Sequence, residues 1–264
     1  MTTSLLVTRE GPVATLTLNR PESLNTLDFT LMDALVDAAG EVAGDDALRV
    51  VVIRGAGKHF MAGGDLRTFA GMLEGEPSER TVRFKRMIAR LHSAIEAFHR
   101  MPHPVVGVVQ GAVAGFGLSL MNACDLVVAA DNAYFASAYR AIGLTADGGG
   151  SWALPRLAGM RRAMEIMLLA ERFDAEQAHA WGLVNRVVPL ADVDATVAAM
   201  VGSLVAAPTL AVRNAKRLMR ESLGRSLSEQ LDAEAASFAA CAATPDFAEG
   251  VAAFLEKRPA RFDK

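Results

Sequence analysis

Short apolar runs, most of them rich in valine, recur along the first 190 residues and predict buried strands. Between most of them lie stretches in which apolar residues return every three or four positions, as on one face of a helix. The first two runs are separated by Gly11-Pro12, and this spacing predicts a hairpin. The predicted strands are 5–7, 13–18, 50–53, 105–109, 126–129 and 184–188.

The helical pattern begins at Asp28, and a longer stretch of it covers about 78–99. From about residue 190 onward it replaces the strand pattern altogether. The sequence therefore predicts an α/β core over residues 1–190 and a helical C-terminal region over residues 191–264. The helices predicted in that region are 191–206, 209–223, 227–242 and 246–255.

Composition and charge narrow the class of protein. Hydrophobic residues make up 52% of the 264 residues, which excludes a disordered chain. The net charge is −3 and the chain has no basic run, so we expect no nucleic-acid partner. The two cysteines are too few for a disulfide framework, and the first ten residues lack the pattern of a secretory signal. We therefore expect a cytoplasmic protein.

One uncharged stretch, 101–124, is long enough to cross a bilayer. Two prolines and four glycines interrupt it, and Pro104 leads directly into the apolar run VVGVV. This arrangement is typical of a buried strand followed by a turn. We therefore expect no membrane partner.

Two segments share one order of features: an apolar strand, a glycine-rich turn and the start of a helix. They are VVVIRGAGKHFMAGGDL (50–66) and VVGVVQGAVAGFGLSL (105–120). Glycine lets a backbone approach a ligand closely, and the first N–H groups of a helix have no helical partner. Each turn could therefore offer N–H donors to an oxyanion, although a tight turn needed only for packing explains either one equally well. Neither segment matches a nucleotide-binding motif.

Asp147 is a lone carboxylate among apolar and glycine residues in AIGLTADGGGSWALP. Burial would raise its pKa towards the range of a general base. A plain alternative is that Asp147 caps the helix that follows it. His92, on the long predicted helix, is more typical of a packed histidine than of a catalyst. No metal-binding motif is found, so we expect no metal.

Taken together, these segments resemble those of the crotonase, or enoyl-CoA hydratase/isomerase, superfamily. The resemblance implies a crotonase-like spiral of ββα units with a helical C-terminal trimerisation region, and an acyl-CoA substrate. Coenzyme A would enter as part of the substrate, with no further cofactor. By motif position, the N–H groups of Gly64 and Phe116 would hold the thioester oxygen. The segments that carry the resemblance are NRPESLNTLD (19–28), HFMAGGDL (59–66), QGAVAGFGLSLMNACDLVVAA (110–130), AEQAHAWGLVNRVVP (175–189) and FLEKRPARF (254–262).

The sequence departs from the family at the two positions where hydratases carry catalytic glutamates. Ser119 and Tyr139 stand there, and neither supplies a carboxylate that could activate water near neutral pH. Asp147 falls where isomerases of the family carry a catalytic aspartate. The similarity is strongest to 1,2-epoxyphenylacetyl-CoA isomerases, so the resemblance favours an isomerase.

Three other activities stay open as alternatives. An enoyl-CoA hydratase would need a second carboxylate. A hydrolase similar to the 4-chlorobenzoyl-CoA dehalogenases could use His92, although Tyr139 replaces the tryptophan of those enzymes. A non-catalytic acyl-CoA-binding paralogue would not need to keep both glycine turns and Asp147.

The resemblance also implies a substrate site and an assembly. Aromatic surface near the acyl group would come from Tyr139 and Phe116, helped by Trp152 and Phe135. Phe254 and Lys257 would reach the coenzyme A site of a neighbouring subunit in a homotrimer or a hexamer made of two trimers. Within one chain, coenzyme A would lie along Ser23, Leu24, Ala62, Asp65, Leu66 and Arg67.

Overall fold

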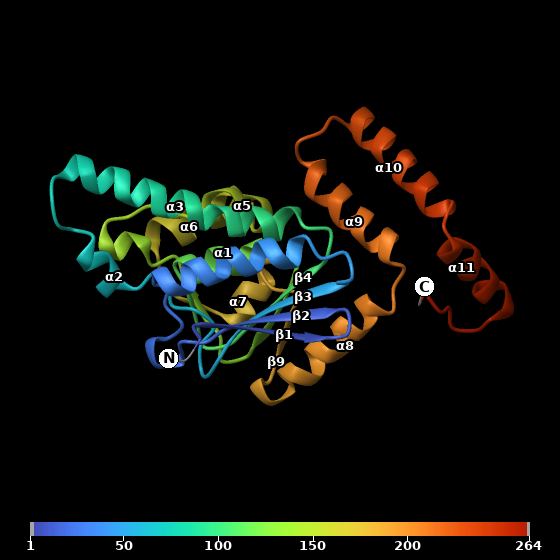
Figure 1. Cartoon of the computed structure of the whole chain (residues 1–264), viewed down its shortest axis with the longest axis horizontal. Helices are drawn as coiled ribbons and strands as arrows, with labels where there is room; N and C mark the ends of the chain where they lie inside the picture. Colours follow the sequence, from blue (N-terminus) through green and yellow to red (C-terminus); the bar gives the residue numbers. More distant parts are fainter. Residues whose placement is uncertain (1–2, 263–264) are drawn as a thin grey trace.

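The computed structural model describes residues 3–262, and Figure 1 shows a layered α/β core with C-terminal helices projecting from one end. A six-stranded sheet forms the centre of the core, with the strand order β1-β2-β3-β4-β6-β9. The β1 and β2 strands pair antiparallel through a two-residue turn at Gly11-Pro12, which confirms the predicted hairpin, and the other pairs are parallel. The strands of this sheet are β1 (Leu5–Glu10), β2 (Val13–Leu18), β3 (Val50–Gly55), β4 (Val105–Val109), β6 (Leu126–Ala130) and β9 (Arg186–Val188).

Alternate residues of the central strands face opposite layers, because successive side chains of a strand point to opposite faces. Val51 and Ile53 of β3 join the main core under α1 (Phe29–Ala43) and α3 (Pro77–Arg100). Val50 and Val52 point the other way and pack with α8 (Val193–Val205). Both faces of the central strands are therefore covered, as the continuous apolar runs predicted, whereas the edge strand β1 is exposed from Leu6 onward.

A second, three-stranded sheet was not expected from the sequence. It has the order β5-β7-β8 and consists of β5 (Ala112–Ala114), β7 (Tyr134–Ala136) and β8 (Phe173–Asp174). Strands of two or three residues are too short to leave a periodic pattern. Its first strand, β5, lies in the second glycine-rich segment and is followed directly by α4 (Phe116–Ala123). The remaining helical elements up to β9 are η1 (Pro21–Ser23), α2 (Leu66–Gly71), η2 (Tyr139–Ile142), α5 (Gly150–Leu157), α6 (Gly159–Leu169) and α7 (Ala175–Ala180).

The predicted boundary near residue 190 follows the last strand, but the first helix after it still belongs to the core. A short turn, η3 (Leu190–Asp192), leads into α8, which packs on the sheet. The part that projects in Figure 1 consists of α9 (Thr209–Ser222), α10 (Leu227–Ala242) and α11 (Pro245–Glu256). Within residues 3–262, no single helix is long and apolar enough to cross a membrane, and two bent helix pairs reach that length only when taken together.

Candidate active site

The segment 19–28 is fastened to the turn that follows β3 by a buried asparagine. Asn25 accepts a hydrogen bond from the Arg20 N–H (2.8 Å) and donates to the carbonyls of Ala56 (3.0 Å) and His59 (2.8 Å). Asn25 has a φ of 54°, a left-handed conformation that asparagine tolerates better than most residues. This residue therefore fixes the loop that lies beside the first glycine turn.

The loop and the glycine turn also exchange backbone hydrogen bonds. Ala62 donates its N–H to the Leu24 carbonyl (3.1 Å), and Leu27 donates to the Gly63 carbonyl (2.8 Å). Asp65 in turn donates to the Leu27 carbonyl (2.9 Å). The residues expected to bind coenzyme A therefore lie on two adjacent segments, 23–24 and 62–67.

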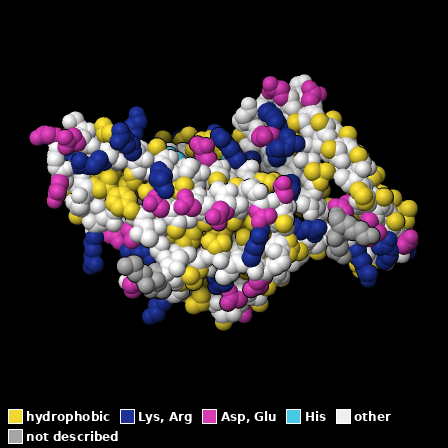
Figure 2. Space-filling model, in the orientation of Figure 1, with side chains coloured by type: hydrophobic (Ala, Val, Ile, Leu, Met, Phe, Trp, Pro, Cys, Tyr) yellow, Lys and Arg dark blue, Asp and Glu magenta, His cyan; other side chains and the backbone are white. Residues whose placement is uncertain are grey.

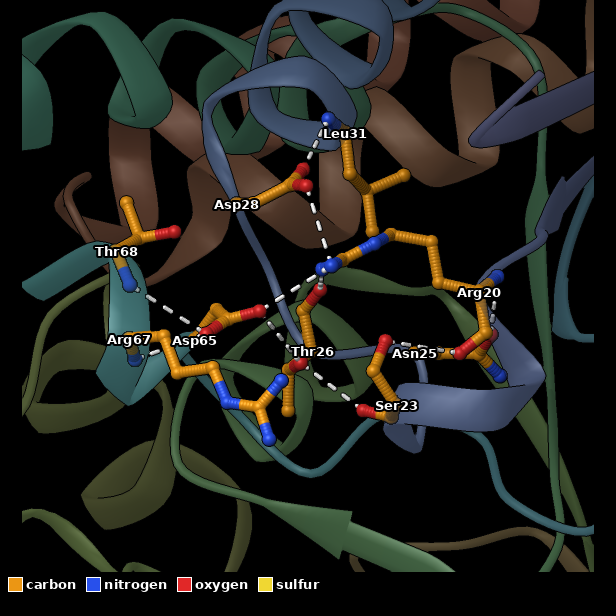
Figure 3. A network of polar contacts seen from close by, with 9 residues as sticks. All are labelled: Arg20, Ser23, Asn25, Thr26, Asp28, Leu31, Asp65, Arg67 and Thr68. Carbon is orange, nitrogen blue, oxygen red and sulfur yellow. Dashed lines mark hydrogen bonds and ion pairs between the residues drawn. The ribbon is translucent and has the colours of Figure 1, made fainter. Parts of the chain in front are cut away.

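A polar cluster around Arg20 ties these segments together (Figure 3). One terminal nitrogen of Arg20 lies 3.2 Å from Asp28 Oδ2 and 3.2 Å from Asp65 Oδ2, and the other donates to the Thr26 carbonyl. Asp65 also caps α2 by accepting from the N–H groups of Arg67 (2.9 Å) and Thr68 (3.4 Å). Partial burial by itself raises the pKa of Asp65, but the hydrogen bonds from Arg67 and Arg20 outweigh it and hold that pKa below its usual value.

The two glycine turns meet at one point. A Cβ atom added to Gly63, which has a φ of 99°, would lie 3.2 Å from the Ala114 carbonyl oxygen and 3.7 Å from the Phe116 nitrogen. A Cβ atom on Gly117 would lie 2.3 Å from the Met61 carbonyl oxygen. Glycine is therefore needed here for the close approach of two backbones, as the packing explanation of these turns requires.

Two N–H groups at this junction have no acceptor among residues 3–262. They belong to Gly64 and to Phe116, the first residue of α4. The preceding residue, Gly115, has φ 54° and ψ −124°, a conformation open to glycine. Both residues line one cavity of about 500 Å³. Two donors on the wall of one cavity can bind an oxygen atom that becomes negative during a reaction.

Asp147 lines the same cavity, on the loop between η2 and α5. Its Oδ1 accepts a hydrogen bond from the Tyr139 hydroxyl (2.5 Å), and its backbone carbonyl accepts one from the Ser119 hydroxyl (2.8 Å). Burial raises the pKa of Asp147, although the hydrogen bond from Tyr139 offsets part of that rise. The helix-capping alternative is wrong, because Gly149 stands at the N-cap of α5 and no side chain caps it.

The loop of Asp147 is held against α4 and α3. Gly148 donates its N–H to His92 Nε2 (3.1 Å). A Cβ atom on Gly148 would lie 2.8 Å from the Phe116 ring and 2.8 Å from Ser119 Cβ. His92 therefore accepts a hydrogen bond through Nε2, a use that the sequence did not reveal.

The rest of the cavity is mainly apolar. Phe69 and Phe84 form an edge-to-face pair at 5.5 Å, and the Phe69 ring packs directly on Gly64. The sequence did not predict this aromatic wall. Of the four aromatic residues that it suggested, Tyr139 and Phe116 line the cavity, whereas Phe135 and Trp152 do not. Phe135 is buried in a stack with Phe173, and Trp152 packs edge-to-face on His99. The apolar wall consists of Phe29, Met32, Phe69, Phe84, Met87, Ile88, Leu91, Ile142 and Leu144.

Two predicted residues lie away from this site within the chain. Phe254 and Lys257 belong to α11 and its C-terminal end, whereas α2 and the start of α1 lie at the opposite end of the molecule in Figure 1. Within the described part of the chain, no group of three His, Cys, Asp or Glu side chains could hold a metal ion.

Comparison with known proteins assigns the fold and narrows the chemistry. Residues 8–264 match the family model described as enoyl-CoA hydratase/isomerase. The chain is 35% identical over 253 residues to 1,2-epoxyphenylacetyl-CoA isomerase of Escherichia coli (strain K12), covering 96% of this chain and 95% of that one. It is 33% identical over 245 residues to 4-chlorobenzoyl coenzyme A dehalogenase-2 of Arthrobacter sp, covering 93% of this chain and 88% of that one. A crystal structure of an enoyl-CoA hydratase from Polaromonas sp. JS666 superimposes with a TM-score of 0.89 at 36% identity, covering 97% of this chain and 98% of that one. This similarity confirms the crotonase-like fold.

Proposed function

Because the chain belongs to the enoyl-CoA hydratase/isomerase family, we propose that it is an acyl-CoA isomerase that works through a thioester enolate. Such an enzyme moves a double bond or isomerises an epoxyphenylacetyl-CoA. The observation that carries the proposal is the composition of the cavity. Asp147 shares it with the N–H groups of Gly64 and Phe116, which have no acceptor among residues 3–262, while hydroxyl groups stand at the positions of the hydratase glutamates.

The proposed reaction is a proton shuttle by one carboxylate. Asp147 removes a proton from the carbon beside the thioester, and the electron pair moves onto the thioester oxygen. The N–H groups of Gly64 and Phe116 bind that oxygen, and each such donor is worth on the order of 3 kcal/mol. Asp147 then returns the proton at the vinylogous carbon, so the double bond moves and no atom is gained or lost. One base suffices, and no cofactor is needed beyond the coenzyme A of the substrate.

The shape and lining of the cavity favour a ring or a medium-length acyl chain over a crotonyl group. Its volume of about 500 Å³ lies in the usual range for small-molecule sites. Its wall holds several aromatic and aliphatic side chains, including Phe69 and Phe84, and few polar groups. We propose that the acyl group occupies this apolar part and that the thioester lies beside Gly64.

For coenzyme A, we propose the rim formed by the segments 23–24 and 62–67. Leu24 and Leu66 are exposed there, where they can contact the adenine and pantetheine groups. Arg67 is exposed as well, and its guanidinium takes part in none of the polar contacts drawn around Arg20 in Figure 3. We therefore propose Arg67 as a partner of the phosphates.

Hydration and dehalogenation are less well supported by the same cavity. The Ser119 hydroxyl already donates to the Asp147 carbonyl. A serine also cannot take a proton from water unless a neighbouring base first removes the proton of its own hydroxyl. His92 Nε2 already accepts the N–H of Gly148, so this nitrogen is not available to take a proton from water.

A turnover panel tests the proposed function. We expect conversion of a medium-chain 3-enoyl-CoA or of epoxyphenylacetyl-CoA into a product of equal mass, separated by chromatography and identified by mass spectrometry. In D₂O, one base that returns its own proton should give less than one deuterium per product molecule. Efficient hydration of crotonyl-CoA, which adds the mass of one water, would contradict the proposal. Stabilisation by acyl-CoA without turnover of any of these substrates would favour a non-catalytic binding protein.

We also propose that the chain forms a trimer or a pair of trimers. The projecting helices expose large apolar side chains, among them Leu227, Phe238, Phe254 and Leu255, and Figure 2 shows hydrophobic side chains along the outer edge of this part. Burial against another subunit would remove that surface from water. In such an assembly, Phe254 and Lys257 would contribute to the coenzyme A site of a neighbour.

Light scattering on the full-length protein is therefore expected to give about three or six times 28.0 kDa. Truncation before Asp246 should weaken binding of coenzyme A even where the core folds, which circular dichroism can verify. A monomer with full activity would contradict this prediction.

A further inference from the structure

We propose that Tyr139 is a positioning residue for the general base, and that it holds Asp147 through Oδ1 so that Oδ2 is the atom that carries the proton. The inference rests on the isomerase function proposed above, and it gives Tyr139 a different role from the substrate contact that the sequence suggested.

The hydrogen bonds around Asp147 leave one carboxylate oxygen available. Oδ1 accepts from the Tyr139 hydroxyl, whereas no hydrogen-bond donor within residues 3–262 is paired with Oδ2. A carboxylate held through one oxygen cannot turn freely about its last bond. Oδ2 is therefore the oxygen that a substrate proton can reach.

The hydroxyl protons of Ser119 and Tyr139 are both donated to Asp147, and these two hydrogen bonds hold it in place. Ser119 lies 3.3 Å from the Tyr139 hydroxyl and gives its own proton to the Asp147 carbonyl (2.8 Å). The Tyr139 proton is then available for Oδ1. Burial and the neighbouring Asp147 charge raise the pKa of Tyr139, so it stays protonated and acts as a donor rather than as an acid. The two positions that hold glutamates in hydratases thus hold two hydroxyls that bond to Asp147, one to its backbone carbonyl and one to its carboxylate.

The same hydrogen bond affects the protonation of the base. A donor to the charged form of a carboxylate lowers its pKa, and Tyr139 offsets part of the rise that burial causes in Asp147. The other groups that face Asp147 are Ser119 of α4 and His92 of α3, whose Nε2 accepts the Gly148 N–H. Loss of the Tyr139 hydroxyl should therefore raise the pKa of Asp147 further.

The chain offers a matched control, because it has only two tyrosines. Tyr134 lies on β7, where Arg172 packs over its ring at 5.1 Å, and it does not line the cavity. Tyr139→Phe should lower kcat roughly 10-fold to 100-fold, the scale for a hydrogen bond to a charged group, with little change in KM. It should also move the acid limb of the pH–rate profile to higher pH. Tyr134→Phe should change neither quantity. An unmoved acid limb in Tyr139→Phe, or a loss confined to KM, would overturn the proposal.

A spectroscopic measurement tests the contact without turnover. Fluorotyrosine incorporated into Tyr134→Phe labels residue 139 alone, and its ¹⁹F resonance should shift with pH as Asp147 ionises. Asp147→Asn should abolish that titration while the resonance stays dispersed, which shows that the protein is folded. If no isomerase activity is found but this titration is present, the proposed function fails and the coupling between the two residues stands. A resonance that does not respond to Asp147 would overturn the inference in either case.

Discussion

Replacing Asp147 with asparagine is expected to reduce the isomerisation rate by on the order of 10²-fold or more, the scale of general acid–base catalysis. Asparagine has nearly the same shape and can still accept the Tyr139 hydrogen bond, but it cannot take a proton. The affinity for coenzyme A should persist, because Asp147 lies on the loop between η2 and α5 and not on the segments 23–24 and 62–67 that we propose bind coenzyme A. Steady-state kinetics on the best substrate of the panel, with calorimetric titration of coenzyme A, would measure both quantities.

Asp194→Asn is a suitable control, because Asp194 is exposed on α8, where it pairs with Arg54, and neither residue lines the cavity. It should keep the wild-type rate. An Asp147→Asn variant with the wild-type rate on both the 3-enoyl-CoA and the epoxide would refute the proposed base.

The same substitution should also make the protein more stable near neutral pH. Burial raises the pKa of Asp147, so the folded state holds its ionised form at a cost that the unfolded chain does not have. This cost develops as pH rises through the unfolded and then the folded pKa of the carboxyl group, and the neutral asparagine does not incur it. The difference in melting temperature between Asp147→Asn and the wild type should therefore widen as pH rises over that interval. A residue that lowers stability but serves the reaction is what a catalytic role predicts.

The local patterns of the sequence were enough to predict most elements of the core. The strands 13–18 and 105–109 and the helix 227–242 have the predicted bounds. Apolar alternation marks the first, a continuous apolar run marks the second, and a capping box at Ser226 marks the helix. The three-stranded sheet was missed because its strands are very short. Such strands form only where tertiary contacts bring them together, as when the Met61 N–H reaches the Ala112 carbonyl.

The site was only partly predictable for the same reason. Gly64, Phe116 and Asp147 stand in unusual local sequences, and the resemblance to a family gave them roles. The cluster of Arg20 with Asp65 joins residues 45 positions apart, and the Tyr139 hydrogen bond depends on how η2 folds over α4. The aromatic wall from Phe69 and Phe84 comes from two helices whose sequences show only an apolar face. Contacts of this kind arise from folding and leave no local signal.

Replacing Asp125 with alanine is expected to destabilise the protein by about 3–5 kcal/mol, the usual cost of removing one partner of a buried ion pair. Asp125 lies between α4 and β6, where its carboxylate contacts Lys216 Nζ (2.7 Å) and two nitrogens of Arg220 (3.0 and 2.7 Å) and accepts the Val105 N–H (2.8 Å). The Lys216 side chain is only 6% exposed. Without Asp125, a buried ammonium group would keep only its hydrogen bonds to the carbonyls of Phe98 and His103.

Urea unfolding of Asp125→Ala at one fixed protein concentration would measure this loss, since subunit association also contributes to stability. The exposed pair of Asp194 and Arg54 provides the control, and Asp194→Ala should cost less than about 1 kcal/mol. The sign of the pH dependence gives a second check. Burial lowers the pKa of Lys216, and losing Asp125 should lower it further. Between that pKa and the unfolded value of 10.5, the unfolded chain binds more protons, so the variant should gain stability as pH rises.

The ion pairs of Asp125 also bear on assembly, because they join α9 to the core. Lys216 and Arg220 belong to α9, and their contacts with Asp125 attach the first projecting helix to the core. The positions of α10 and α11 depend on α9, because both follow it in the chain and α10 packs on it. Asp125→Ala should therefore also lower the mass found by light scattering, if the projecting helices form the subunit interface as proposed. A variant as stable as Asp194→Ala would mean that the contacts of α9 with the core contribute little, and that other packing holds these helices.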